Sequence, residues 1–267
     1  MKYLKPINEF WGDVLKRDLL GETREEDRFH SKEELKEYLE SEIEKQGENV
    51  VIRNLDVSLV ENLKGLFYEI GNEIKTLDLS DWKTSNVKNM QSMFLGCINL
   101  KSINLSGWDV SNVEDMGWMF SSCSNIESFN LSGWETYSVN NMRYMFEGCR
   151  SLKSLDLSSW DTSNVKSMRS MFAHCAGLKS INLSGWDTSN VEDMGWMFSS
   201  CDNIESLNLS GWNTSEVTDM SLMFNDCGNL KSLDLSGWDT SNVKRTHCMF
   251  YNCPAPYEVI NNKIVKK

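Results

Sequence analysis

The sequence is short of the residues on which most enzymes and nucleic-acid-binding proteins depend. It has three histidines and three prolines, and its 27 lysine and arginine residues are outnumbered by 39 aspartate and glutamate residues. The resulting net charge of -12 at pH 7 opposes binding to a phosphate backbone, which needs clustered basic side chains. We therefore expect no nucleic acid as the primary ligand.

The sequence also lacks long apolar runs. No uninterrupted apolar stretch is long enough to span a membrane. The opening stretch MKYLKPINEFWGDVLKRDLLG has no apolar core of the kind found in signal peptides. These features predict no membrane insertion, and they favour a cytoplasmic or virion-associated protein over one at the cell surface.

What the sequence does contain is a strict period of 26 residues in two residue types. The tryptophans of this period are Trp82, Trp108, Trp134, Trp160, Trp186, Trp212 and Trp238. The cysteines are Cys97, Cys123, Cys149, Cys175, Cys201, Cys227 and Cys253. Such regularity identifies a solenoid, in which each repeat packs on its neighbours.

A longer period is superimposed on the first one. Residues 106–123 and 184–201 differ only at Val110 and Thr188, and they lie 78 residues apart. This distance equals three repeats, so a block of three repeats has been duplicated.

Within one repeat, residues 151–175, the apolar spacing changes from two to about 3.6. Leu155 and Leu157 alternate with a polar residue, which predicts a short strand. The DTSN stretch at 161–164 supplies turn and helix-capping residues. The positions that follow at intervals of three and four, one face of a helix, are Val165, Met168, Phe172 and Cys175. Each repeat is therefore predicted to be strand, turn and helix.

The strings LKSLDLSSWDTSNVKSMRSMF and LKSINLSGWDTSNV resemble the BspA-type leucine-rich repeat, over about residues 74–253. This resemblance implies a non-enzymatic solenoid used for adhesion or binding, often at the surface of bacteria. The stretch KPINEFWGDVLKRDLLGETREED is similar to the openings of proteins of gut bacteriophages and mobile elements. We therefore hypothesise a scaffold of phage or mobile-element origin, with a bacterial cell-surface adhesin as the alternative.

The predicted fold class is α/β, a leucine-rich-repeat-type right-handed solenoid with a parallel sheet and a small N-terminal helical segment. Residues 1–49 form the helical appendage, with one helix following Ser31 and another over residues 7–19. Residues 50–76 form a degenerate capping repeat, 77–253 the solenoid of seven repeats, and 254–267 a C-terminal cap with a last strand at 257–265. A stack of this size is a rod roughly 40 Å long.

Columns that stay constant in every repeat are predicted to form the core. The tryptophan column, Trp108 included, stacks aromatic rings, and the cysteine column supplies buried thiols rather than disulfides. In contrast, 100° per residue places Trp118 opposite the core side of its helix. We interpret this outward column and two neighbouring arginines as partner-binding candidates. They are Trp118, Tyr144, Trp196, Leu222, Arg143 and Arg169.

Two other interpretations of the surface remain open. Large side chains of the outward column could fold over gaps between repeats, helped by Gly117 and Gly195, without binding anything. A glycan could instead bind along the polar face of the strands. The candidates on that face are Asn104, Asn130, Asp156, Asn182 and Asn208.

No pattern in the sequence indicates catalysis. His30, His174 and His247 stand in no recognisable nucleophile or metal motif, and no glycine-rich phosphate loop follows a strand. We expect no enzyme activity, no catalytic residues, no cofactor and no metal. The expected partner is a protein, with a glycan as the alternative.

Overall fold

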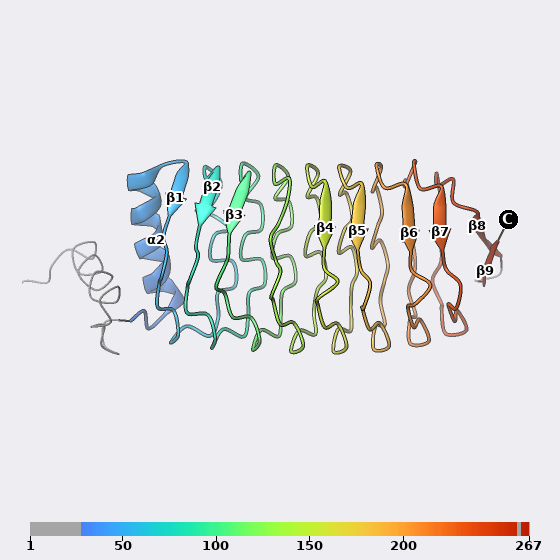
Figure 1. Cartoon of the computed structure of the whole chain (residues 1–267), viewed down its shortest axis with the longest axis horizontal. Coiled ribbons are helices and arrows are strands. Elements are labelled where there is room, and N and C mark those ends of the chain that lie inside the picture. The colour runs from blue at the N-terminus through green and yellow to red at the C-terminus, as the bar shows by residue number, and fades with distance from the viewer. Residues whose placement is uncertain (1–27, 261–262, 267) are drawn as a thin grey trace, which may run out of the picture.

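The computed structural model describes residues 28–260 and 263–266, which form a straight stack of repeats (Figure 1). The helix predicted over residues 7–19 lies outside the described residues. The described elements are α2 (Lys32–Gln46), β1 (Asn49–Val51), β2 (Thr76–Asp78), β3 (Ser102–Asn104), β4 (Ser154–Asp156), β5 (Ser180–Asn182), β6 (Ser206–Asn208), β7 (Ser232–Asp234), β8 (Tyr257–Ile260) and β9 (Lys263–Lys266).

Helix α2 lies at the N-terminal end of the stack (Figure 1), where its sequence signals predicted a helix. The Ser31 hydroxyl accepts a hydrogen bond from the backbone N–H of Glu34, and Gly47 ends the helix with a φ of 66°. Leu35, Tyr38 and Leu39 are buried. The helix prediction is therefore confirmed.

Short parallel strands form one side of the solenoid. Leu77 of β2 pairs with Val50 of β1 and with Ile103 of β3, each one repeat away. The strands pair as β1-β2-β3, β4-β5 and β6-β7, so the ladder is interrupted between these groups. Their central residues face the core and their flanking residues face solvent. The predicted strands and parallel sheet are thus present.

The helix predicted for each repeat is wrong. On the side opposite the strands, a parallel ladder of single bridges links Asn62 to Asn89 and continues repeat by repeat to Arg245. The backbone there consists of successive turns. Met93 N–H donates to the Met90 carbonyl, and Ser92 between them has a φ of 56°, as a type II turn requires at its third position.

The spacing of the repeats explains this difference. Strands in one ladder lie about 4.8 Å apart, whereas an α-helix with side chains is about 10 Å wide. A straight stack has no room for one helix per repeat. Alternate N–H groups instead reach the next repeat, as when Ser92 donates to the Gly117 carbonyl at 2.8 Å and Phe94 to the Met119 carbonyl at 2.8 Å.

The left-handed backbone of these turns leads to a testable expectation. Gly96 has a φ of 75°, and a Cβ built on it would have nothing within 4 Å. Gly96→Ala should therefore destabilise the protein through backbone strain alone, by about 1 kcal/mol. Urea unfolding measures the change. Gly228→Ala is the matched control, since Gly228 has equal space and an ordinary φ, and a similar loss in this control would contradict the assignment.

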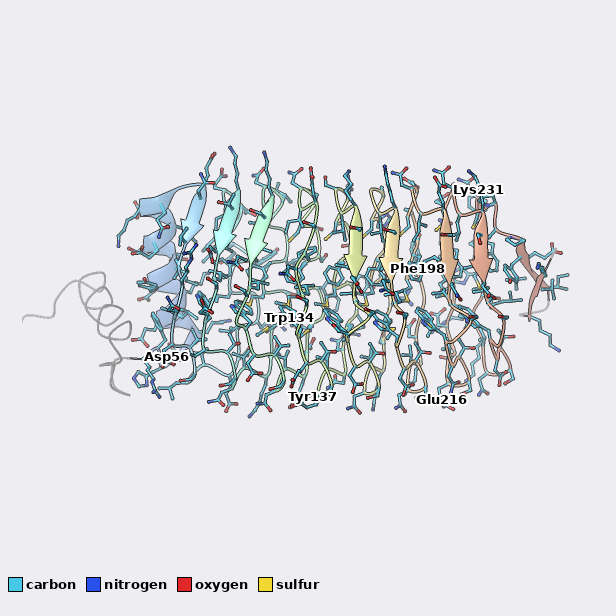
Figure 2. All side chains as sticks on the ribbon, viewed as in Figure 1. Asp56, Trp134, Tyr137, Phe198, Glu216 and Lys231 are labelled. Atoms are coloured by element: carbon cyan, nitrogen blue, oxygen red, sulfur yellow. The ribbon has the colours of Figure 1, made fainter. Side chains whose placement is uncertain are left out.

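The core lies between the two ladders, where the same side chain stacks on its copies in adjacent repeats. Trp134 and Phe198 lie within the body, while Tyr137, Glu216 and Lys231 lie along its edges (Figure 2). Phe94 stacks on Phe120 at 5.4 Å between ring centroids. Trp108 is 5 % exposed, so its assignment to the core is confirmed. These columns bury most of the apolar side chains.

The cysteines are free thiols, and all but Cys248 are buried. The Cys149 thiol donates to the Phe120 carbonyl at 3.3 Å, and burial raises its pKa well above the ordinary value. Burial likewise raises the pKa of Cys175 to about 12.

A thiolate is the reactive form of cysteine, so these thiols should be inert in the folded protein. Iodoacetamide should modify only Cys248 under native conditions and all eight cysteines in denaturant, as read by intact mass. Rapid native alkylation of several cysteines would contradict the burial of this column.

The C-terminal end differs from its prediction in one respect. In place of one strand over 257–265, β8 and β9 pair antiparallel, with Val259 opposite Ile264. Tyr257 stacks on Phe250 at 6.2 Å, so this hairpin covers the last repeat.

Candidate binding face

The outward column lies on the turn ladder, opposite the strands. Trp118, Tyr144, Trp196 and Leu222 are each half-buried, and each occupies the left-handed third position of its turn, with φ between 54° and 64°. Side chains at this position leave the ladder toward solvent, while the neighbours of Trp118, namely Met116, Met119 and Phe120, face the core. We call these four residues, three aromatic and one leucine, the aromatic column.

Its first two members form a stacked pair. The rings of Trp118 and Tyr144 stack with centroids 4.8 Å apart and planes 7° apart. The Arg143 guanidinium carbon lies 5.1 Å from the centroid of the Trp118 ring, a cation–π geometry. The Arg143 Nε also donates to the Asn141 Oδ1 at 3.0 Å. This pair presents a flat apolar surface with a positive charge above it.

A pocket of about 300 Å³ separates this pair from Trp196. Tyr144 and Trp196 line it together with the small, buried side chains of Ser170 and Ala173. It exists because the repeat between the two aromatic residues carries a serine in the column. The polar residues around it are Glu147, Arg169 and His174. The pocket could accept an apolar side chain between two rings.

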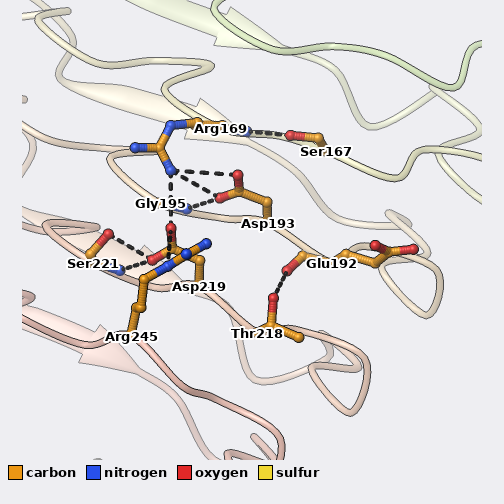
Figure 3. Close-up of polar contacts among 9 residues, drawn as sticks. All are labelled: Ser167, Arg169, Glu192, Asp193, Gly195, Thr218, Asp219, Ser221 and Arg245. Atoms are coloured by element: carbon orange, nitrogen blue, oxygen red, sulfur yellow. Dashed lines mark hydrogen bonds and ion pairs between the residues drawn. The ribbon is translucent and has the colours of Figure 1, made fainter.

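Arg169 is held in place by two carboxylates from the next two repeats (Figure 3). Its Nη1 lies 3.4 Å from Asp193 Oδ1 and 3.0 Å from Asp219 Oδ2. Arg245 reaches the same Asp219 oxygen at 3.0 Å. Asp219 thereby links three repeats and fixes the guanidinium at the edge of the pocket.

Asp219 is almost fully buried, at 2 % exposed. Burial alone would raise the pKa of its carboxyl, but hydrogen bonds from Ser221 and the charges of Arg245 and Arg169 outweigh it and lower the pKa. The Ser221 N–H and hydroxyl donate to Asp219 Oδ1 at 2.9 and 2.6 Å. Although partial burial opposes it, the interactions with Asp193, Tyr144 and Asp219 raise the pKa of Arg169. Both groups are therefore charged at neutral pH.

Gly195 makes this arrangement of Arg169 sterically allowed. A Cβ at Gly195 would lie 2.8 Å from the Arg169 Nη1, and a Cβ at Gly117 would lie 2.8 Å from the Asn141 side-chain nitrogen. From the sequence, these glycines were connected with gaps between repeats and Arg169 with partner binding, but the ion pair of Arg169 with Asp219 was not predicted. The signal was an arginine in one repeat, a glycine immediately before the next column member and an aspartate one repeat after that.

The polar column of the strands lies on the opposite side. Asn104 Nδ2 donates to Asp78 Oδ1 at 3.1 Å. Asp156 accepts from the Ser158 hydroxyl at 2.7 Å, and its hydrogen bonds with Ser158 lower its pKa. The side-chain oxygens of Asn130, Asn182 and Asn208 accept from the serine two residues later in the same way. This face is therefore largely occupied by its own hydrogen bonds.

Within residues 28–260 and 263–266, no group of three or more histidine, cysteine or acidic residues could hold a metal ion. Over the same residues, no helix has the length and apolar character needed to cross a membrane. His30, His174 and His247 are each exposed, in separate parts of the stack.

Comparison with family models gives one result. The model described as mycoplasma protein of unknown function, DUF285, matches residues 35–130, 61–181, 101–204 and 174–264. These overlapping matches span nearly all of the described solenoid. The chain belongs to this family. No curated protein matches the chain in sequence.

Solved structures give more distant likenesses. A leucine-rich-repeat protein of T. pallidum is similar at 18% identity, over 78% of this chain and 77% of that one, with a TM-score of 0.38. TLR13 in its complex with ssRNA13 is similar at 16% identity, over 82% of this chain, with a TM-score of 0.33. This chain covers 38% of the length of TLR13.

Proposed function

We propose that the protein is a non-enzymatic binding scaffold that holds a protein partner on its aromatic column. The scaffold is of the BspA-type leucine-rich-repeat class and derives from a phage or mobile element. The observation that carries the binding proposal is the pocket between Tyr144 and Trp196, next to the Trp118–Tyr144 pair. Half-exposed tryptophan and tyrosine at the edge of a pocket are the commonest anchors of protein interfaces.

The pocket favours a partner of definite chemistry. Tyr144 and Trp196 lie two repeats apart, which is about 10 Å along the ladder, with one repeat between them. This distance leaves space for one inserted apolar or aromatic side chain. Glu147 borders the pocket, and Glu114 and Glu192 are exposed near the two tryptophans in sequence. The partner should therefore place an apolar side chain between the rings and basic residues around it.

Affinity capture from a lysate of the native source tests this proposal. The intact chain is compared with Trp118→Ser/Trp196→Ser, which introduces the residue already present at Ser92 and Ser170 of the same column. The matched control is Tyr137→Ser/Tyr251→Ser, which removes two exposed tyrosines elsewhere.

One protein should be retained by the intact chain and by the control, and lost by the tryptophan variant. Equal retention by all three proteins would remove the aromatic column as the binding site. Urea unfolding of each protein verifies that it is folded.

A further inference from the structure

In the described residues the strand ladder opens at three places, and two of them are equivalent by the duplication of the three-repeat block. Where it is closed, Leu79, Leu157 and Leu209 donate their backbone N–H to the next repeat, at 2.9 to 3.0 Å. In the described residues, Leu105 and Leu183 lack this bond. The indole N–H groups follow the same pattern. Trp108, Trp186 and Trp238 donate to the preceding repeat, whereas Trp134 and Trp212 have no such bond in the described residues.

Each of the two equivalent openings is a pocket on the strand side, just beyond the ends of the strands. One, of about 510 Å³, lies between the repeats of Leu105 and Asn130, and the other, of about 520 Å³, between those of Leu183 and Asn208. All nine residues of the second pocket have counterparts 78 residues earlier in the first. The third opening lies between the repeats of Leu131 and Asp156, where the Leu131 backbone N–H and the Trp160 indole N–H both lack their bond to the adjacent repeat. The Trp160 indole nitrogen is buried there without a partner among the described residues.

The duplicated block leaves a free amide donor in each pocket. Asn104 donates to Asp78, and Asn182 interacts likewise with Asp156. Asn130 and Asn208 come next in the column, after an asparagine rather than an aspartate.

Their Oδ1 atoms accept from Ser132 and Ser210. In the described residues, their Nδ2 groups donate to no side chain. The amide donors of the two pockets are therefore available to a ligand.

Each pocket also offers an acceptor beside this donor. Asp109 and Asp187 each use Oδ1 to accept from the serine two residues later, which leaves Oδ2 for a ligand. A small apolar area of tryptophan and leucine side chains borders each pocket, as with Trp108 and Trp134 of the first pocket, which are 5 % and 4 % exposed. Among the residues that the structure describes, no lysine, arginine or histidine lines either pocket, so anionic ligands are disfavoured. A neutral ring with several hydroxyl groups matches these features.

We propose that the two pockets are equivalent subsites for neutral sugar residues of one polysaccharide chain. One hydroxyl accepts from the asparagine amide, and another donates to the aspartate. The subsites lie three repeats apart, about 14 Å along the ladder, so one polymer reaches both and binds through avidity. This surface lies opposite the aromatic column, and the inference is independent of the proposed function.

Affinity electrophoresis in native gels containing laminarin, yeast mannan, galactomannan or xylan tests the proposal. Three proteins are compared over a range of polysaccharide concentrations: the intact chain, Asn130→Ser/Asn208→Ser in the pockets, and Asn104→Ser/Asn182→Ser outside them. The two variants change the same residue type in the same column, at the same separation. Each loses the bond to the serine that follows.

At least one of the four polysaccharides should slow the intact chain and the control pair. The pocket pair should show an apparent Kd raised at least about 100-fold. No retardation of the intact chain in any gel would overturn the proposal, as would equal behaviour of the two variants. If the pocket pair does not fold, Asp109→Asn/Asp187→Asn replaces it, because this change keeps the oxygen that accepts from the following serine. A Kd raised to the same extent would then support the proposal, and behaviour equal to that of the control pair would overturn it.

Discussion

Phe146→Ala is expected to cost about 3–5 kcal/mol of unfolding free energy. Phe146 is fully buried, and its ring stacks on Phe120 at 5.7 Å and on Phe172 at 5.8 Å. It also meets Phe129 edge-on at 5.3 Å. Removal leaves a cavity that touches both neighbouring repeats, and in a solenoid the stability is a sum over such neighbour contacts. The loss should therefore exceed that of an isolated core residue.

Urea unfolding followed by tryptophan fluorescence measures this loss. Phe250→Ala is the matched control, because Phe250 occupies the same column in the last repeat, where it is only partly buried. It stacks on Phe224 and Tyr257, and the same substitution there should cost less than half as much. Equal losses at the two positions would mean that the stacked rings do not stabilise the solenoid as described.

Asp219→Ala is expected to cost about 2–3 kcal/mol, since it removes buried hydrogen bonds to a charged group. It deprives the Ser221 N–H and hydroxyl of their acceptor and releases Arg169 and Arg245. Asp193→Ala is the matched control, because Asp193 occupies the same column with its side chain 28% exposed. The loss of unfolding free energy in Asp193→Ala should stay below about 1 kcal/mol. Thermal and urea unfolding compare the two, and a larger loss at Asp193 would contradict the linking role of Asp219.

The same carboxyl predicts a pH dependence. Its folded pKa lies below the value of 3.8 that an unperturbed aspartate has, so its contribution to stability is fully present above about pH 4. That contribution is lost as pH falls through the folded pKa. Asp219→Asn should therefore flatten the acid limb of a stability curve measured from pH 5 to pH 2. An unchanged acid limb would assign acid unfolding to other carboxyls.

The columns of the core could be predicted from sequence because they recur in every repeat. Trp108 and Phe120 pack in the core in the same way as the tryptophan and phenylalanine at the equivalent positions of the other repeats. A period of 26 residues therefore identifies them without any knowledge of the backbone. The strands were also predicted, but the backbone of the second half of each repeat was predicted wrongly as a helix. Apolar spacings of three and four describe a helix and a series of type II turns equally well, because both bury Met116, Phe120 and Cys123.

A signal against the helix was present in the sequence. Gly96 and Gly148 stand at equivalent positions near the end of the stretch, where the structure requires a positive φ. The network of Asp219 could not be predicted from one repeat, because Arg169 reaches carboxylates in the next two repeats. The two pockets at Asn130 and Asn208 depend on which neighbour each asparagine has, which a consensus over all repeats conceals.

The affinity of the purified partner for the intact chain and for Trp118→Ser/Trp196→Ser tests the binding face most directly. Isothermal titration gives both dissociation constants on proteins whose folding has been verified. Two anchors worth about 2 kcal/mol each predict a Kd at least about 100-fold higher for the variant. A Kd within about threefold of the intact chain's would show that the partner binds elsewhere on the solenoid.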